Sequence, residues 1–212
     1  MTKLVILHGL GQNEDDWEKV VEHIAVNSQI IPLFTVINKN SDVTIETIYP
    51  KISKKLDEIT EPYYLCGLSL GGLLALMYTC KSTNRYLKGI IIASAIHKPI
   101  PKTINLFQSL LFTILPKKNF ETIGLSKKQM IQLTSSINID LTESLKRINL
   151  PSLILCGEKD TVNLKYAKQI HALIPSSDLS IVPNGKHELN KNSYLELSKA
   201  INYFIIKKES IY

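Results

Sequence analysis

Short apolar runs alternate with longer stretches of helical spacing along the whole chain. The runs are about four to eight residues long and are flanked by Gly, Pro or Asn; they cover residues 4–7, 29–36, 63–66, 89–93, 152–156 and 179–182. Because their apolarity is continuous, they predict strands buried on both faces, as in a parallel sheet. The stretches between them predict helices over residues 16–26, 45–59, 71–79, 164–173 and 193–206. Strands and helices in turn predict an α/β fold, with a doubly wound, mostly parallel six-stranded sheet.

The alternation is interrupted once, over residues 97–149. This segment contains helical patterns over residues 103–115, 126–137 and 141–148. It is longer than a crossover needs and too short for a core of its own. We therefore expect a single domain over residues 1–212 that contains a helical cap insertion over residues 97–149. Ligands of such sheets bind at the carboxyl ends of the strands, so the cap is expected to cover the site.

Composition and charge indicate which classes of partner the chain is expected to bind. The chain carries 25 Lys and Arg against 19 Asp and Glu, a net charge of +6 over 212 residues. Almost all the basic residues are Lys, spread singly or in pairs with no basic and aromatic face of the kind that binds nucleic acid. We therefore expect no nucleic-acid partner, and a Lys-rich surface that is simply solvated.

The cysteines and the hydropathy of the chain indicate the cellular compartment in which the protein is expected to lie. Cys66, Cys80 and Cys156 are odd in number, lie in apolar segments and lack metal-ligand spacing, which indicates buried thiols in a reducing compartment. The apolar run near Met1 is shorter than that of a signal peptide, and no window approaches the roughly 20 apolar residues of a membrane span. We expect a cytoplasmic monomer or homodimer with no membrane partner.

The most informative motif is the run Gly67-Leu68-Ser69-Leu70-Gly71, directly after one predicted strand and at the start of a predicted helix. A serine at such a sharp turn adopts a strained backbone, and the flanking glycines let the strand and the helix approach without Cβ clashes. The hydroxyl is then pushed outward at the end of the strand. The run therefore indicates that Ser69 is a catalytic nucleophile.

A serine nucleophile needs an imidazole to accept its proton and a carboxylate to fix the tautomer of that imidazole. Asp160 follows the strand predicted over residues 152–156, and His187 follows the last predicted strand. Parallel strands bring both loops to the edge that carries Ser69, and the chain order Ser, Asp, His is the one this architecture uses. Glu158, in the same loop as Asp160, remains a rival for the acid.

Four other histidines compete with His187. His23 and His171 lie within predicted helices, which favours surface or packing roles. His8 belongs to the first loop and is expected to brace it by hydrogen bonds. His97 follows a predicted strand and is a candidate for lining the pocket.

The oxyanion of a tetrahedral intermediate needs two backbone N–H donors. One is predicted to come from Leu70, which follows the nucleophile at a helix N-terminus, where the helix dipole favours negative charge. The second is predicted to come from Leu10, in the loop after the first strand, because Gly9 and Gly11 on either side let its amide approach closely.

Taken together, these segments resemble the α/β-hydrolase superfamily over residues 3 to about 206. The resemblance is carried by His8-Gly9-Leu10-Gly11 with Trp17, Gly67-Leu68-Ser69-Leu70-Gly71-Gly72, Gly157-Glu158-Lys159-Asp160 with Val162, and Gly185-Lys186-His187. The first two look most like small carboxylesterases related to the pimeloyl-ester esterase of biotin synthesis. The resemblance implies that Ser69 is the nucleophile, Asp160 the acid and His187 the base. It also implies that the backbone N–H groups of Leu10 and Leu70 are the oxyanion donors.

The chain departs from this superfamily in two places. The superfamily usually has two further strands before its His-Gly loop, whereas this chain begins at the strand that precedes that loop. Its Asp-x-x-Gly-x-Gly turn after the next strand is absent, and residues 34–40 stand in its place.

The predicted function is therefore a serine hydrolase that cleaves a carboxylic ester of small to medium size through an acyl-enzyme on Ser69. His97, Phe107, Leu110 and Val162 are the candidate substrate contacts. No dinucleotide fingerprint follows the first strand and no His or Cys pair has ligand spacing, so neither a cofactor nor a metal is expected.

Several alternatives use the same residues. The triad could instead serve an acyltransferase, a thioesterase, an amide hydrolase or a hydrolase of carbon–carbon bonds. A non-catalytic binding protein on a hydrolase scaffold is an alternative of another class.

Overall fold

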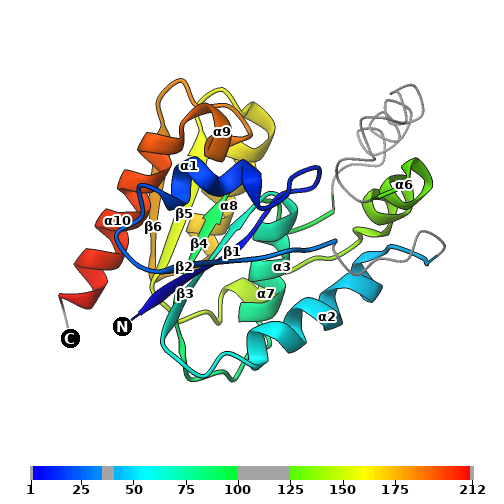
Figure 1. Cartoon of the computed structure of the whole chain (residues 1–212), viewed down its shortest axis with the longest axis horizontal. Helices are drawn as coiled ribbons and strands as arrows, with labels where there is room; N and C mark the ends of the chain where they lie inside the picture. Colours follow the sequence, from blue (N-terminus) through cyan, green and yellow to red (C-terminus); the bar gives the residue numbers. More distant parts are fainter. Residues whose placement is uncertain (1, 35–40, 100–124, 211–212) are drawn as a thin grey trace.

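The six predicted strands form one sheet in a computed structural model that describes residues 2–34, 41–99 and 125–210. The strands lie in the order β2-β1-β3-β4-β5-β6, and every neighbouring pair is parallel (Figure 1). Their bounds are β1 Lys3–Leu7, β2 Ser28–Ile31, β3 Tyr63–Leu68, β4 Leu87–Ala93, β5 Ser152–Gly157 and β6 Ser177–Val182. The prediction of an α/β fold with a six-stranded parallel sheet is confirmed.

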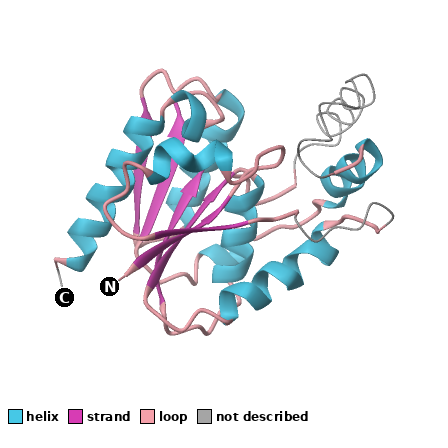
Figure 2. Cartoon of the chain, in the orientation of Figure 1, coloured by secondary structure: helices cyan, strands magenta, loops and turns pink. Residues whose placement is uncertain are grey.

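Helices cover both faces of the sheet (Figure 2). One face is covered by α2 (Ile45–Asp57), α3 (Leu70–Thr79) and α8 (Thr161–Leu173). The other is covered by α1 (Glu18–Val21), α9 (Leu189–Asn192) and α10 (Tyr194–Glu209). The sheet is therefore doubly wound, with one apolar core on each side.

Strand β1 shows why the apolar runs are continuous. Val5 and Leu7 belong to the core beneath α2 and α3, and Leu4 and Ile6 belong to the core beneath α1 and α10. All four side chains are fully buried. Because alternate residues of a strand face opposite sides, a strand with a core on each side needs apolar residues at every position.

Strand β2 and the helix predicted over 16–26 differ from the prediction. Strand β2 ends at Ile31 because Pro32 has no N–H to donate to the ladder; residues 35 and 36, the last two of the strand predicted over 29–36, lie outside the described residues. The helix predicted over 16–26 is a 3-10 turn, η1 (Asp15–Trp17), followed by the four-residue α1. After Val21 the helical pattern ends: the N–H groups of His23 and Ile24 donate to carbonyls only three residues back, and the N–H of Ala25 donates to Oδ1 of Asn202 in α10.

The segment predicted as an insertion is described only in part. Helix α6 (Lys127–Ser136) lies where a helix was predicted over 126–137, and helix α7 (Thr142–Leu145) covers only the middle of the helix predicted over 141–148. The helix predicted over 103–115 lies outside the described residues. Helix α6 contacts the start of α2, where the N–H of Ile45 donates to Oγ of Ser136 over 2.9 Å.

Among residues 2–34, 41–99 and 125–210, none of the helices combines the length and the apolar character that crossing a bilayer requires.

Candidate active site

Ser69 occupies the turn between β3 and α3 in a strained backbone conformation, with φ 55° and ψ −112°. Positive φ is unfavourable for a residue with a Cβ, and such strain concentrates at functional sites. The N–H of Ser69 donates to the carbonyl of Ala93 over 2.9 Å, which fixes the turn to the end of β4. The hydroxyl caps no helix N–H, so it is available to the loops beyond the sheet.

Gly71 allows this turn to lie directly on β1. A Cβ at this position would overlap the carbonyl oxygen of Leu7 and lie 2.6 Å from that of His8. These are backbone atoms that cannot move away independently of the strand. Glycine is therefore required for α3 to begin immediately after Ser69 and beside the first loop.

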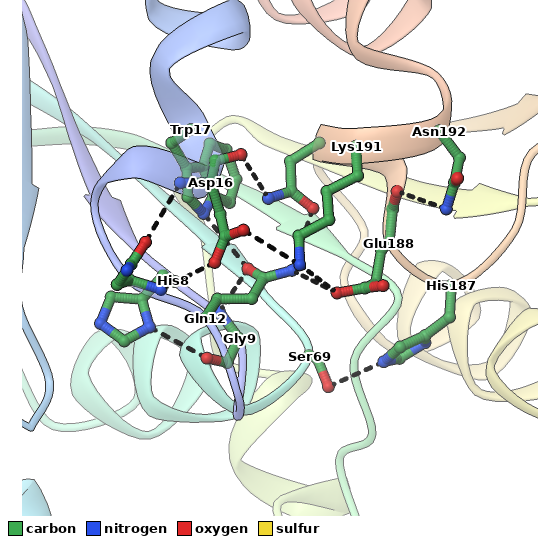
Figure 3. Close-up of polar contacts among 12 residues, drawn as sticks. His8, Gly9, Gln12, Asp16, Trp17, Ser69, His187, Glu188, Lys191 and Asn192 are labelled. Carbon is green, nitrogen blue, oxygen red and sulfur yellow. Dashed lines mark hydrogen bonds and ion pairs between the residues drawn. The ribbon is translucent and has the colours of Figure 1, made fainter. Parts of the chain in front are cut away.

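Ser69, His187 and Asp160 form one chain of hydrogen bonds. Oγ of Ser69 lies 3.0 Å from Nε2 of His187, as Figure 3 shows, and Nδ1 of His187 lies 2.8 Å from Oδ2 of Asp160. Because a carboxylate only accepts, Nδ1 carries the proton and Nε2 is left to accept from the serine hydroxyl. The three predicted residues therefore lie together in the order that proton transfer from serine requires.

The carboxylate of Asp160 is 7% exposed and is fully engaged. Its Oδ1 accepts from Nδ2 of Asn163 over 2.8 Å and from the backbone N–H of the same residue over 3.4 Å, which caps α8. Burial alone would raise the pKa of Asp160, but the hydrogen bonds from His187 and Asn163 outweigh it and hold the pKa below its usual value. The group is therefore an anion beside His187.

The two loops that carry Asp160 and His187 touch through glycines. A Cβ on Gly157, the last residue of β5, would overlap the backbone of Gly185. The rival acid, Glu158, points elsewhere: its Oε2 accepts the backbone N–H of Asn184 over 2.8 Å. Of the two candidate carboxylates, only Asp160 is hydrogen-bonded to His187 in this structure.

One predicted oxyanion donor lies in the first loop, and the other lies directly after Ser69, at the sharp turn between β3 and α3 that we call the elbow. Leu70 is the first residue of α3, and Leu10 lies in the turn after β1. Among the described residues, neither backbone N–H has a hydrogen-bond acceptor. An unpaired N–H at the start of a ten-residue helix is a favourable donor for an anion.

His8 braces the first loop, as the sequence predicted. The backbone N–H of Leu33 donates to its Nε2 over 3.1 Å, so Nδ1 carries the proton and donates to the carbonyl of Gly9 over 2.9 Å. Burial lowers the pKa of His8, which keeps the ring in this neutral form. His23 and His171 are bonded within or next to their own helices, to the carbonyl of Lys19 and to the hydroxyl of Ser177.

The predicted substrate-contact residues differ in their exposure to solvent. Val162 is 50% exposed, two residues beyond Asp160. His97 is 1% exposed, and its ring meets that of Tyr166 edge to face at 5.8 Å. Phe107 and Leu110 lie outside the described residues.

Two residues at the site were not singled out from the sequence. Asn163 could have been found from its spacing, since a side chain three residues after a helix N-cap lies beside the capping carboxylate. Gln12, whose side-chain partners Glu188 and Asn190 are more than 170 residues away, carries no local signal. The described residues contain no group of three or more His, Cys, Asp or Glu arranged to hold a metal ion.

No family model matches the chain. A search of curated proteins finds a putative 2-succinyl-6-hydroxy-2,4-cyclohexadiene-1-carboxylate synthase of Haemophilus influenzae, which is 27% identical over 251 aligned residues. The match covers 99% of this chain and 97% of that protein. This identity relates the chain to such proteins without showing that it shares their activity.

Solved structures resemble the chain over almost its whole length. MenH from S. aureus matches with a TM-score of 0.79 at 19% identity, covering 98% of this chain and 94% of that one. A carboxylesterase structure from the thaumarchaeon Nitrososphaera gargenis matches with a TM-score of 0.81 at 14% identity, covering 100% and 92%. With the strand order above, these matches show that the chain has the α/β-hydrolase fold.

Proposed function

We propose that the chain is a serine hydrolase that cleaves a carboxylic ester of small to medium size through an acyl-enzyme on Ser69. The observation that carries the proposal is the unbroken hydrogen-bond chain from Oγ of Ser69 through His187 to Oδ2 of Asp160. The resemblance of its motifs to small carboxylesterases agrees with it.

In the first half-reaction, Oγ of Ser69 attacks the acyl carbonyl while its proton passes to Nε2 of His187. The resulting imidazolium donates from Nδ1 to the anionic Asp160, which stabilises it. The tetrahedral intermediate collapses when His187 returns the proton to the leaving alkoxide. The ester C–O bond breaks, the alcohol departs and the acyl group stays on Ser69.

In the second half-reaction, a water molecule takes the place of the alcohol. His187 accepts a proton from the water as its oxygen attacks the acyl-enzyme carbonyl, and the second tetrahedral intermediate then collapses. Oγ of Ser69 leaves and recovers its proton from His187. The products are a carboxylic acid and the free enzyme, so the atoms and the charges balance over one turnover.

The negative charge of both intermediates falls on the carbonyl oxygen of the substrate. We assign its stabilisation to the backbone N–H groups of Leu10 and Leu70, which have no other acceptor among the described residues. Removing one such donor typically costs about 3 kcal/mol of transition-state stabilisation. The positive end of the dipole of α3 acts in the same direction.

Residues 97–149 are proposed to form the cap of this site, with Val162 and His97 among the residues that shape the substrate pocket. The proposed site needs no cofactor and no metal, since a serine, an imidazole and backbone amides supply every group of the mechanism. A small-molecule ester is the proposed substrate.

One second candidate has specific support. The Haemophilus influenzae relative named as a putative 2-succinyl-6-hydroxy-2,4-cyclohexadiene-1-carboxylate synthase aligns with 99% of this chain. The chain could therefore catalyse the reaction named for that relative. Substituting the chain for that relative in its reaction and assaying for the named product distinguishes the two candidates.

The proposal is tested with a fluorophosphonate probe, which reacts with an activated serine. We expect the wild type to be labelled at Ser69, as located by peptide mass spectrometry, and the Ser69→Ala variant to remain unlabelled. A panel of p-nitrophenyl esters of increasing acyl length then measures the substrate range. Folded wild type that is neither labelled nor able to hydrolyse any ester of the panel would favour the non-catalytic alternative.

A further inference from the structure

Gln12 is 3% exposed, and four hydrogen bonds use the whole amide of its side chain. Its Oε1 accepts from the backbone N–H of Gly9 over 3.0 Å and from the indole N–H of Trp17 over 3.3 Å. Its Nε2 donates to Oε1 of Glu188 over 3.2 Å and to Oδ1 of Asn190 over 3.1 Å. A buried amide with this many partners is held in one place.

These partners allow only one orientation of the amide. Both neighbours of its oxygen are N–H groups, and both neighbours of its nitrogen are oxygen atoms. The orientation of Asn190 is set independently, because its Nδ2 donates to the carbonyl of Asp16 over 3.0 Å. Rotating the amide of Gln12 by half a turn would place its NH₂ group against two N–H donors. The oxygen and the nitrogen of the Gln12 amide therefore bind different sets of groups and cannot exchange places.

The oxygen end acts on the loop that carries Leu10. The carbonyl of Gly9 accepts from Nδ1 of His8 over 2.9 Å and from the backbone N–H of Gln12 over 3.3 Å, and Figure 3 shows this loop between His8 and Gln12. That carbonyl and the N–H of Leu10 belong to one planar trans peptide, so they point in opposite directions. Holding Gly9 by both its N–H and its C=O therefore fixes the direction of the Leu10 N–H.

The nitrogen end acts on the loop that carries His187. Glu188 is the next residue in the chain, and its Oε1 also pairs with Nζ of Lys191 over 3.1 Å. Lys191 in turn reaches Oδ1 of Asp16, beside the first loop, over 3.0 Å. The loop of the proposed oxyanion donor and the loop of the proposed base thus meet at one buried amide (Figure 3).

We propose that Gln12 is a positioning residue for the reaction. It fixes the position of the Leu10 N–H relative to the loop that carries His187. It acts through Gly9 and Glu188 and touches no reacting atom. This inference rests on the proposed function of Ser69, His187 and Leu10. A site whose supporting contacts are loose loses transition-state stabilisation before it loses substrate binding.

The test uses Gln12→Glu in the full chain. A glutamate can still accept from Gly9 and Trp17, but it presents a second oxygen to Glu188 and Asn190, so only the contacts to the His187 loop are lost. We expect kcat for p-nitrophenyl butyrate to fall about 10- to 100-fold, with KM within about threefold of the wild type. Gln29→Glu is the matched control, because this exposed glutamine accepts from Lys3 on the far edge of the sheet and should leave kcat unchanged.

Rescue separates positioning from mere destabilisation. In the double variant Gln12→Glu/Glu188→Gln, the new amide at position 188 can donate to the new carboxylate at position 12, so we expect at least a tenfold recovery of kcat. Glu188→Ala removes the same contact at a side chain that is 42% exposed, without burying a charge, and should lower kcat about threefold. Urea unfolding midpoints accompany each variant.

The kinetic results for these variants either support or overturn the positioning role of Gln12. A loss of kcat that the double variant recovers, together with the smaller loss in Glu188→Ala, supports the proposal. Wild-type kcat in Gln12→Glu overturns it, as does a loss that the double variant fails to recover or unchanged kcat in Glu188→Ala. A wild type without Ser69-dependent ester hydrolysis refutes the proposed function itself, and this is seen before any Gln12 variant is measured.

Discussion

Nδ2 of Asn163 donates a 2.8 Å hydrogen bond to Oδ1 of Asp160, the carboxylate oxygen that does not face His187. The same Nδ2 lies 3.2 Å from Nδ1 of His187, so the amide touches both ends of the acid–base pair. Because Nδ1 carries a proton, the hydrogen bond of Asn163 goes to the carboxylate. Asn163 thereby leaves Oδ2 of Asp160 free for the imidazole.

Replacing Asn163 with Ala should lower kcat/KM about tenfold, because Oδ1 of Asp160 then keeps only the 3.4 Å hydrogen bond from the backbone N–H of residue 163. The hydrogen bond from Asn163 lowers the pKa of Asp160, so its loss raises that pKa. Asp160 is then protonated at a higher pH, so the loss of kcat/KM that accompanies its protonation should begin at a higher pH on the acid side of the profile. The profile is measured with p-nitrophenyl butyrate from pH 4 to 9.

The exposed Asn27, which directly precedes β2, provides the control for this substitution. Asn27→Ala should keep the wild-type profile. An Asn163→Ala enzyme whose rate and acid limb match the wild type would show that Asn163 only caps α8.

Two glycines differ in what a methyl group would meet, which predicts a graded effect on folding. A Cβ at Gly71 overlaps the backbone of Leu7, so Gly71→Ala should lower the free energy of unfolding by about 3 kcal/mol or more. A Cβ at Gly9 meets only side-chain atoms, Cδ2 of Leu68 at 3.0 Å and Oε1 of Gln12 at 3.2 Å. Gly9→Ala should therefore fold, losing about 1 kcal/mol.

Urea denaturation followed by circular dichroism measures both glycine variants. Equal unfolding free energies for the two would mean that α3 can move away from β1 without loss, contrary to the close contact at the elbow.

The buried His97 should make the free energy of unfolding depend on pH. Burial lowers its pKa to about 4, Lys98 acts in the same direction and Asp140 opposes them; its Nδ1 has no hydrogen-bond partner among the described residues. The unfolded chain therefore binds more protons than the folded one between pH 6.5 and 4, so stability falls as the pH falls through this window. From pH 7.5 to pH 5 this group contributes a loss of roughly 2 kcal/mol.

His97→Gln removes the titrating group and keeps a polar side chain. The wild type should lose roughly 2 kcal/mol more unfolding free energy than this variant between the two pH values. Parallel losses in both proteins would show that His97 is charged in the folded state or does not titrate in this range.

The sequence predicted the sheet because β1 and its neighbours have a core on each side, and this leaves an unmistakable continuous apolar run. Ser69, Asp160 and His187 were predictable as a group because each follows a strand, and parallel strands place their carboxyl ends at one edge. The structure brings the three side chains into hydrogen-bond contact.

What the sequence did not predict depends on contacts between distant residues. Beyond the end of α1 the N–H of Ala25 bonds to Asn202, which lies 177 positions away in α10. The role of Gln12 depends on Glu188, which lies 176 positions away. Neither contact is visible from the residues on either side, so periodicity could not reveal them.

The rate of p-nitrophenyl butyrate hydrolysis by wild type and by Ser69→Ala is the decisive test of whether Ser69 is the nucleophile of an ester hydrolase. We expect a saturable wild-type rate and a loss of at least about 10³-fold in the variant, with an unchanged unfolding midpoint, since the hydroxyl makes no structural cap. A folded Ser69→Ala protein that hydrolyses the ester at the wild-type rate would contradict it.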